Sequence, residues 1–458
     1  MPRPRVFRDQ IHGQIRFKRV DLSNDVPTEA ERKTGWLIPN LINCSEFQRL
    51  RHIRQNGLTN LVFSGMEHSR FSHSIGVSYL AGQMHDRVIT NAGLEAETDR
   101  KLALLAAGLL HDIGHGPFSH VLEEVLREVG IAFDHEHFSS RIIQEDTEIN
   151  ACLKAIDITF PDAILPFIDK KKRLANHWIY RIVSSQLDAD RLDYLLRDAL
   201  QAGLQGHGFD MPRLLDMLTT FDEKHIGVDR HAKEAVEAYL VMLEHMYAAI
   251  YFHRGIRCAT VLLKSVLRRA VDIYREGDTS VFPIVPANRL AHPFKSLIDE
   301  GNNVAIKQYN RLGDFQIWTL IEEWQQNEDR ILSDLAQRLM KRQRFRAVDI
   351  TSTDINNLIQ TVDSIKSQVR TALPFLNDQT INYYVVIDEP QRTGYKRYDW
   401  LKEITDDSIW MTGGDEPPCP IEDEPNSGIV AGLKRTRYFP RIIFPHEIHS
   451  VVNISKSH

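Results

Sequence analysis

The chain has 458 residues, 42% of them hydrophobic, and a formal net charge of -6, which predicts a folded protein with a sizeable core and argues against general nucleic-acid binding. Its four cysteines include no C-x-x-C pair, which argues against a disulfide framework and against a zinc ribbon. The first residues lack the apolar run of a secretory signal and no stretch approaches the roughly 20 apolar residues of a membrane span, so we expect a cytoplasmic protein without membrane contact.

The amino-terminal residues 1–38 predict a hairpin and a loop. VFRDQIHGQIRF carries an internal Gly13, which is typical of a hairpin turn. The polar stretch from Asp21 to Thr34 predicts a loop. After it, apolar residues recur at three- and four-residue spacing, the period of amphipathic helices. We therefore expect residues 39–275 to form one helical domain.

Residues 276–458 predict a smaller α+β region. The segment 277–302 predicts loops, and helical patterns return in GDFQIWTLIEEWQQN and DRILSDLAQRLMKR. Short strand-like segments follow between turn signals: RFRAVDI, INYYVVID, SIWMTGG and YFPRIIF. The predicted fold class is therefore mainly α, a helical body with a smaller α+β carboxy-terminal region.

Half of the 20 histidines precede residue 138, and a histidine–aspartate pair among them stands out. His111 and Asp112 end a helix that is otherwise alanine and leucine. An unpaired carboxylate buried there would cost several kcal/mol, and a divalent metal bound by both residues removes that cost. Gly114 and Gly116 supply the irregular helix end that lets neighbouring residues share one metal. The alternative for such a pair alone is a core histidine beside a capping carboxylate.

Two further segments supply candidate ligands of the same metal. RFSHSIGV places His73 in the first turn of a helix. SSQLDADRLDYLLRDAL places Asp190, Tyr194 and Arg197 on one helix face. Two imidazoles and two carboxylates suit a transition metal such as Mn, Fe or Zn, and the absence of thiolates argues against a structural zinc site. A solvated helix face is the alternative for Asp190.

These residues, in this order, resemble the H…HD…D pattern of the HD-domain phosphohydrolases. The resemblance is closest to the deoxynucleoside triphosphate triphosphohydrolases and spans about residues 6–263. It rests on the segments FQRLRHIRQNG, HSRFSHSIGVSYLAG, LAAGLLHDIGHGPFSHVLE, DHEHFS and IVSSQLDADRLDYLLRDALQAG. It implies that residues 39–275 form an HD catalytic domain, which splits a deoxynucleoside triphosphate (dNTP) into a deoxynucleoside and inorganic triphosphate.

The resemblance also implies a role for each matching residue. One divalent metal ion per active site (Mn, Fe, Zn or Mg) would be held by His73, His111, Asp112 and Asp190. Proton transfer would fall to His115 and His135, oriented by Glu123. The substrate would contact Gln55, Arg70, His120, Arg191, Tyr194 and Asp198. A nucleotide effector would contact Gln48 and Arg51.

The residue types suit this chemistry. A bound metal lowers the pKa of a nucleophilic water, and arginines such as Arg70 and Arg191 can hold the charge on phosphoryl oxygens. The departing sugar oxygen needs a proton, which a histidine can give near neutral pH. In DHEHF, Asp134 predicts a helix N-cap that would fix His135. The alternative for each of these side chains is a polar surface position.

Several positions depart from the family pattern. Asn43 stands where nucleotide-activated members have an aspartate that reads guanine, and an amide cannot offer two carboxylate oxygens to that base. Ala249 or Ile250 stands in place of an arginine, and Arg257 in place of a tyrosine. Asn56 replaces an apolar residue near the sugar. The first change argues against activation by a guanine nucleotide, the changes at 249–250 and 257 predict an altered substrate preference, and Asn56 predicts weaker discrimination against a 2'-hydroxyl.

Two other functions fit the same residues. One is hydrolysis of another nucleotide phosphoester or a nucleic-acid end, and the other is a nucleotide sensor without catalysis. The basic runs KKKR (170–173) and KRQRFR (341–346) fit either solvated surface or a phosphate or nucleic-acid patch. The resemblance further implies a homo-oligomer, dimer or tetramer, with nucleotides between subunits.

Overall fold

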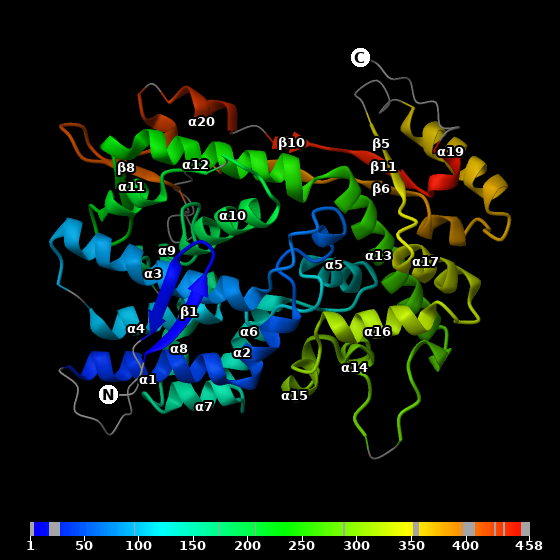
Figure 1. Ribbon diagram of the computed structural model, residues 1–458, viewed down its shortest axis with the longest axis horizontal. Coiled ribbons are helices and arrows are strands. Elements are labelled where there is room, and N and C mark those ends of the chain that lie inside the picture. The colour runs from blue at the N-terminus through cyan, green and yellow to red at the C-terminus, as the bar shows by residue number, and fades with distance from the viewer. Residues whose placement is uncertain are drawn as a thin grey trace.

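Helices make up most of the molecule, as the apolar spacing predicts (Figure 1). The computed structural model describes residues 4–17, 28–95, 97–173, 175–206, 208–286, 289–350, 357–393, 395–396, 408–425, 427–433 and 436–449. Helices up to residue 275 are α1 (Glu29–Asn43), α2 (Ser45–Arg49), α3 (Arg70–Ala92), α4 (Thr98–Leu110), α5 (His120–Glu128), α6 (His135–Gln144), α7 (Glu148–Lys154), α8 (Phe160–Ile168), α9 (Trp178–Arg181), α10 (Ala189–Gln201), α11 (Met211–Asp216), α12 (Lys233–Met246) and α13 (Arg254–Arg275). The predicted fold class is confirmed.

The amino-terminal segment forms an antiparallel hairpin of β1 (Arg5–Asp9) and β2 (Gly13–Phe17). Gly13 has a φ of 67°, in the left-handed region that favours glycine. Of the loop predicted from Asp21 to Thr34, residues 21–27 lie outside the described residues. The loop prediction is wrong from α1 onwards, because Thr28 caps that helix and its hydroxyl accepts from the Glu31 N–H at 3.2 Å.

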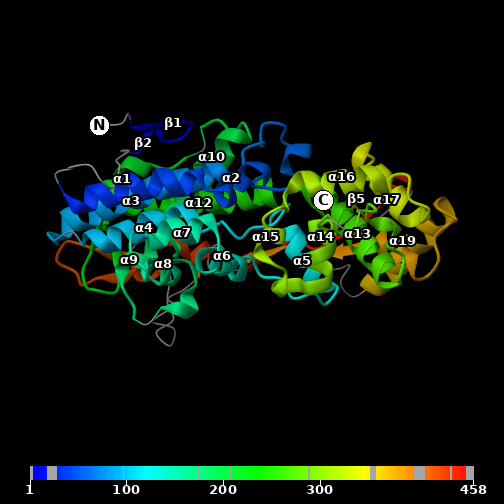
Figure 2. The ribbon, with the colours of Figure 1, turned by 90° about the horizontal axis from the view of Figure 1, so that it is seen from below.

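Helices α3 and α4 form the centre of the helical body. From Leu102 to Leu110 every residue of α4 except Leu105 is buried, as its nearly unbroken apolar sequence predicts. Helix α10 packs against α3, and the β1–β2 hairpin lies along the same side of the body (Figure 2). The amino termini of α3 and α10 and the carboxy terminus of α4 carry the polar residues described below.

The carboxy-terminal region adds α14 (Pro293–Glu300), α15 (Ile306–Tyr309), α16 (Asp314–Trp324), α17 (Arg330–Met340), α19 (Leu358–Ala372) and α20 (Gly428–Leu433). Helix α14 lies inside the segment 277–302, for which the loop prediction is wrong. His292 caps this helix, its Nδ1 accepting from the Phe294 N–H at 3.3 Å, and Pro293 occupies the first helical position.

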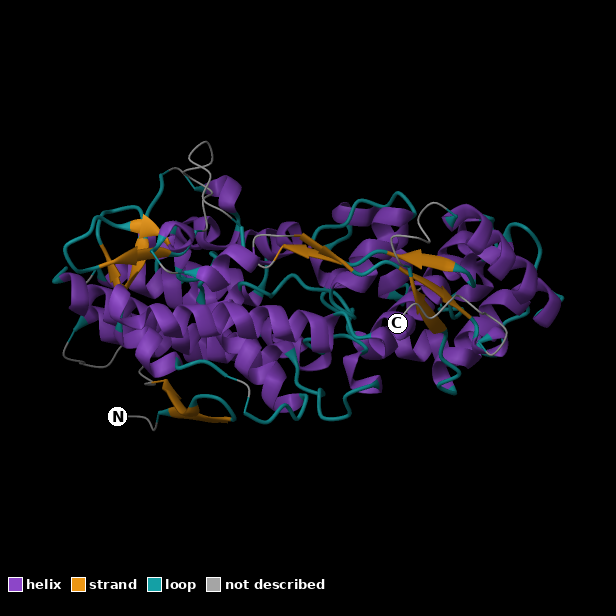
Figure 3. Cartoon of the chain, turned by 90° about the horizontal axis from the view of Figure 1, so that it is seen from above, coloured by secondary structure: helices purple, strands orange, loops and turns teal. Residues whose placement is uncertain are grey.

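The remaining strands are short and stand in three separate groups (Figure 3). They are β3 (Leu218–Thr220), β4 (Ile226–Asp229), β5 (Arg346–Asp349), β6 (Val386–Asp388), β7 (Gln391–Thr393), β8 (Trp410–Thr412), β9 (Cys419–Pro420), β10 (Thr436–Tyr438) and β11 (Arg441–Phe444). Strand β8 pairs parallel with β4, so a sheet crosses the expected boundary between residues 275 and 276. No helix within the described ranges combines the length and hydropathy that a membrane crossing requires.

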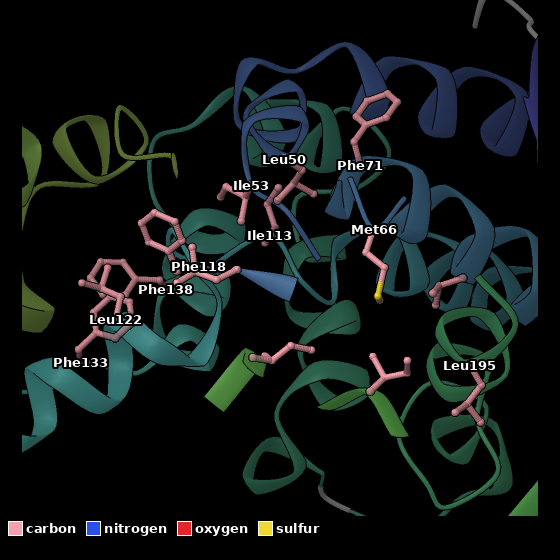
Figure 4. Packing of buried hydrophobic residues seen from close by; sticks show 14 of the residues in the cluster. Leu50, Ile53, Met66, Phe71, Ile113, Phe118, Leu122, Phe133, Phe138 and Leu195 are labelled. Carbon is pink, nitrogen blue, oxygen red and sulfur yellow. The ribbon is translucent and has the colours of Figure 1, made fainter. Parts of the chain in front are cut away.

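An aromatic and aliphatic cluster supports the segment that follows α4. Phe118, Leu122, Phe133 and Phe138 lie together in this cluster (Figure 4) and are buried. Phe138 also stacks on Tyr309, with ring centroids 3.9 Å apart. This packing joins α5, α6 and α15 behind the loop that carries the predicted site.

Candidate active site

The loop of residues 111–119 is held by bonds to its backbone. Arg49 donates from Nη2 to the His115 carbonyl at 2.8 Å, and the Tyr309 hydroxyl donates to the Gly114 carbonyl at 2.6 Å. The Gly114 N–H donates to Ser139 Oγ at 3.0 Å. Because each anchor comes from a different element, the loop has one well-defined path.

Gly114 tolerates no larger residue at this point. A Cβ there would lie 2.2 Å from the His135 carbonyl oxygen and 2.3 Å from the Ser139 backbone nitrogen. We expect Gly114→Ala to lower the free energy of unfolding by about 1–3 kcal/mol, because backbone must move. Urea denaturation followed by circular dichroism measures this change.

Gly116→Ala is the matched control for that experiment. A Cβ at Gly116 would meet only side-chain atoms, the nearest being Leu122 Cδ2 at 3.3 Å. Equal denaturation midpoints for the two variants would contradict the steric argument.

The four predicted metal ligands converge at the ends of α3, α4 and α10. Asp190 Oδ1 lies 3.0 Å from His73 Nε2 and 3.6 Å from His111 Nε2. Asp112 Oδ1 lies 3.4 Å from His111 Nε2, and Asp112 Oδ2 lies 3.8 Å from His73 Nε2. One ligand atom from each of His73, His111 and Asp190 lies within 4.8 Å of the other two. This spacing allows a single ion to contact all three.

The Nε2 atoms of the two imidazoles are oriented to bind a cation. Nε2 of His73 and Nε2 of His111 are buried and have no hydrogen-bond partner among the described residues. Each opposite ring nitrogen is engaged: His111 Nδ1 donates to the Gly108 carbonyl at 2.9 Å, and His73 Nδ1 donates to Asp193 Oδ2 at 2.8 Å. Such bonds turn the free nitrogen of a histidine towards a metal. The donor set therefore fits one divalent metal ion.

The charges of this cluster reinforce one another. Burial favours neutral His73, but the nearby carboxylates of Asp190 and Asp193 outweigh it and raise the pKa of His73 to about 10. Burial likewise opposes ionisation of Asp112, but Arg70 and His111 lower the pKa of Asp112 to about 2. The carboxylates are thus ionised at neutral pH, as metal ligands must be.

Arg70 links the cluster to the strained end of the loop. Its Nη1 contacts Asp112 Oδ2, and its Nη2 donates to Ser119 Oγ at 2.7 Å. Phe118 and Ser119 both have a φ of 56°, which is unfavourable for residues other than glycine. Asp314 supports this turn by accepting the Phe118 N–H at 3.1 Å. Backbone strain held by surrounding contacts is typical of functional sites.

The predicted proton-transfer residues lie beside the metal ligands. His115 and His135 stack with ring centroids 4.1 Å apart, and His135 Nδ1 donates to Glu123 Oε2 at 2.9 Å. Burial, reinforced by Arg70, holds the pKa of His115 well below its usual range. His120 is more exposed, and its Nδ1 lies 3.6 Å from the same carboxylate oxygen.

The loop before α6 confirms one expectation from the sequence. The Asp134 side chain caps this helix by accepting the Glu136 N–H at 2.9 Å. This cap fixes the first turn and so the backbone of His135.

A cavity of about 510 Å³ extends from this cluster. Of the predicted site residues it is lined by Gln55, Arg70, His111, Asp112, His115, His120, His135, Asp190, Tyr194 and Asp198. Of the predicted metal, catalytic and substrate residues, those outside the lining are His73, Glu123 and Arg191. The first two act from behind it, His73 through its contact with Asp190 and Glu123 through His135. Arg191 instead lies 3.8 Å from Asp188 Oδ2.

The far end of the cavity is organised around Asp198. Its Oδ1 accepts from Asn56 Nδ2 at 2.8 Å, and its Oδ2 accepts from the Tyr251 hydroxyl at 2.6 Å. Gln55 Oε1 is buried there without a hydrogen-bond partner among the described residues. An unpaired buried acceptor is costly unless a ligand supplies a donor.

The predicted effector residues lie apart from the cavity. Gln48 Oε1 accepts from Arg51 Nε at 2.8 Å, and the Arg51 guanidinium lies 3.5 Å from the Phe71 ring centroid. Neither residue lines the cavity. Asn43, at the position where nucleotide-activated members of the family carry a base-reading aspartate, accepts a hydrogen bond from Arg5 of the hairpin.

Two residues that contact the predicted site residues escaped the sequence analysis. Asp193 is fully buried and accepts from His73, from His12 Nε2 at 2.7 Å and from Arg197. Its spacing of three residues after Asp190 was the available signal, because it places both carboxylates towards the same end of α3. Tyr251 belongs to a π-helical turn, Tyr247–Tyr251, which no sequence pattern marked.

Comparisons with known proteins agree with this geometry. A model described as "HD domain" matches residues 70–195. The uncharacterized protein YwfO of Bacillus subtilis is 36% identical over 394 residues, which are 86% of this chain and 81% of YwfO. The deoxynucleoside triphosphate triphosphohydrolase SAMHD1 homolog of Dictyostelium discoideum is 28% identical over 88% of this chain and 73% of its own length. The crystal structure of a phosphohydrolase from Bacteroides thetaiotaomicron shares the fold, with a TM-score of 0.76, 23% identity, and coverage of 96% of this chain and 99% of that one.

Proposed function

Because the chain belongs to the HD-domain phosphohydrolase family, we propose that it cleaves dNTPs to deoxynucleosides and inorganic triphosphate. The observation that carries the proposal is the meeting of two buried imidazoles and two carboxylates at one end of the cavity. A cavity of this volume suits a small-molecule ligand. The similarity to the Dictyostelium dNTP triphosphohydrolase homolog supports the choice of substrate.

The proposed metal ligands are His73, His111, Asp112 and Asp190. When bound there, a divalent ion would activate water and polarise a phosphoryl oxygen. Arg70, which is 4% exposed and lines the cavity, would hold a phosphate oxygen with a guanidinium already fixed by Asp112 and Ser119. Fixed cations of this kind stabilise charge that develops on phosphoryl groups.

His135 is the proposed donor of a proton to the departing sugar oxygen. Glu123 engages its Nδ1, which leaves Nε2 for the cavity that His135 lines. Burial opposes ionisation of Glu123, but the neighbouring imidazoles of His120 and His135 outweigh it and lower the pKa of Glu123. The Glu123 carboxylate therefore accepts the Nδ1 proton of His135 and turns Nε2 of that ring towards the cavity.

Glu123→Gln tests this positioning role. We expect kcat to fall about tenfold while KM changes little, because a neutral glutamine accepts a weaker hydrogen bond than a carboxylate and holds the imidazole less firmly. A loss confined to kcat separates this positioning role from a general structural effect. Glu128→Gln, on the same helix and more exposed, is the matched control. An unchanged kcat in both variants would argue against the role.

Gln55 and Asp198 form the proposed deoxyribose end. The unpaired Gln55 Oε1 can accept from a sugar hydroxyl, and Tyr194 lines the adjacent wall. Asn56 already occupies one oxygen of Asp198. The sugar contact therefore depends on Gln55 more than on Asp198.

Product analysis tests the proposed function directly. Purified protein with Mn²⁺ or Mg²⁺ is incubated with each dNTP and each ribonucleotide, alone and mixed, and the phosphate products are separated by anion exchange. Deoxynucleoside plus intact triphosphate is the expected result. Absence of release from every nucleotide despite bound metal would contradict it.

A second candidate is hydrolysis of another nucleotide phosphoester. Arg257 lines the cavity where the triphosphohydrolases have tyrosine, and Asp388 of β6 engages its Nε at 3.0 Å. A paired arginine there changes the charge and shape of the pocket end that would face a base or phosphate. Orthophosphate or monophosphate as the first product would favour this candidate.

Regulation and assembly belong to the same proposal. We propose a nucleotide effector near Gln48 and Arg51 and a homo-oligomer, dimer or tetramer, by analogy with the relatives. Light scattering with and without mixed dNTPs measures the assembly. A monomer under both conditions would contradict it.

A further inference from the structure

Two cysteines and two glutamates meet away from the proposed active site. Cys44 joins α1 to α2, Glu46 belongs to α2, and Glu148 and Cys152 belong to α7. Cys44 Sγ lies 3.6 Å from Cys152 Sγ. One ligand atom from each of Cys44, Glu46 and Glu148 lies within 4.8 Å of the other two. None of the four residues lines the cavity.

Each carboxylate has one oxygen fixed by backbone. Glu46 Oε1 accepts from the Glu148 N–H at 3.1 Å, and Glu148 Oε2 accepts from the Ser45 N–H at 2.7 Å. Glu46 is only 6% exposed, and its Oε2 is buried without a hydrogen-bond partner among the described residues. A buried carboxylate oxygen without a donor or cation is strongly unfavourable.

Acidic groups gather around the two thiols. Among the described residues, neither Glu46 nor Glu148 forms an ion pair with a basic side chain. A bound cation would remove the cost of burying a carboxylate in such a place.

We propose that Cys44, Cys152 and Glu46, with Glu148 at the open side, bind a second divalent metal ion, and that this ion is zinc. Two thiolates at about 2.3 Å from a tetrahedral zinc lie about 3.8 Å apart, close to the spacing of these sulfurs. Thiolates with a carboxylate select a softer ion than the imidazole–carboxylate cluster does. Cys152 is half-buried and Glu148 is exposed, so an ion can enter from α7.

Binding requires no change of oxidation state. The two thiols release their protons to water, and the two thiolates and the Glu46 carboxylate bind the ion. The ion would fasten α2 to α7. Helix α2 also carries Arg49, which holds the His115 carbonyl, so the second metal would stabilise the loop of the active site from behind.

Cobalt substitution tests the proposal in the full chain. Chelator-treated protein is titrated with Co²⁺ under reducing conditions, and the near-ultraviolet sulfur-to-cobalt band is recorded. The imidazole–carboxylate cluster holds no sulfur, so this band reports only thiolate binding. We expect a band that saturates with one cobalt per chain and that added Zn²⁺ removes.

Variants assign the band to residues. Cys44→Ser and Cys152→Ser should each abolish it, while Glu46→Gln should weaken Co²⁺ binding by at least about tenfold. Cys258→Ser is the matched control, because this cysteine is also buried and should leave the band unchanged. Circular dichroism confirms that each variant is folded.

Three outcomes would overturn the proposal. They are no sulfur band in folded wild-type protein, a band that survives both Cys44→Ser and Cys152→Ser, and purified protein that carries a Cys44–Cys152 disulfide in place of metal. The readout does not require nucleotide hydrolysis, so it stands or falls separately from the proposed function.

Discussion

We expect Asp190→Ala to reduce nucleotide hydrolysis by about a thousandfold or more and to remove the active-site metal. Asp190 Oδ1 is the atom closest to both histidine nitrogens, at 3.0 Å and 3.6 Å. Without Asp190, the site keeps two imidazoles but only one carboxylate, that of Asp112, to bind the ion. Added metal should therefore restore little activity.

Kinetics and metal analysis check this prediction together. Product release is measured at saturating Mn²⁺, and bound metal is measured by mass spectrometry after gel filtration. Asp99→Ala, an exposed aspartate in the first turn of α4, is the matched control. Wild-type turnover by a folded Asp190→Ala variant would show that Asp190 is not a required metal ligand.

Local patterns predicted the helices well. The α4 helix is nearly all apolar and therefore buried, and its end carries His111 and Asp112 as the glycines after it suggested. The convergence of His73 and Asp190 on that point follows from the family pattern. Spacing alone left Asp190 equally consistent with a solvated helix face.

Contacts between distant segments could not be read from local patterns. The pairing of β4 with β8 and of Arg257 with Asp388 depends on how the chain returns over itself. Cys44 and Cys152 lie 108 positions apart and fit no metal-binding spacing. The sequence analysis therefore argued against a disulfide framework and a zinc ribbon, because only the fold brings two of the cysteines together.

Asp193 shows the same limit inside the site. Its partners come from the hairpin, from α3 and from its own helix: His12, His73 and Arg197. Helical periodicity predicts only the contact with Arg197, because Arg197 lies one turn further along the same helix. The full set of contacts that Asp193 makes becomes visible only when the position of the hairpin against α10 is known.

Replacing Asp193 with asparagine should weaken metal binding about tenfold to a hundredfold, because it removes the carboxylate that orients a metal-ligating histidine. The substitution should also lower the free energy of unfolding by about 1–3 kcal/mol, since it removes one of the two carboxylates, Asp193 and Asp9, that pair with buried Arg197. Arg197 now donates to both Asp193 oxygens at 2.8 Å. An asparagine amide would turn an N–H group towards one of these donors.

Metal dependence separates this positioning role from that of a direct ligand. Hydrolysis by Asp193→Asn should recover towards the wild-type kcat as Mn²⁺ is raised, whereas Asp190→Ala should not recover. Asp216→Asn, which alters an exposed pair with Arg87, is the control for loss of an aspartate and should change neither metal affinity nor stability. If Asp193→Asn binds Mn²⁺ as tightly as wild type, then the His73 imidazole is oriented by its packing alone.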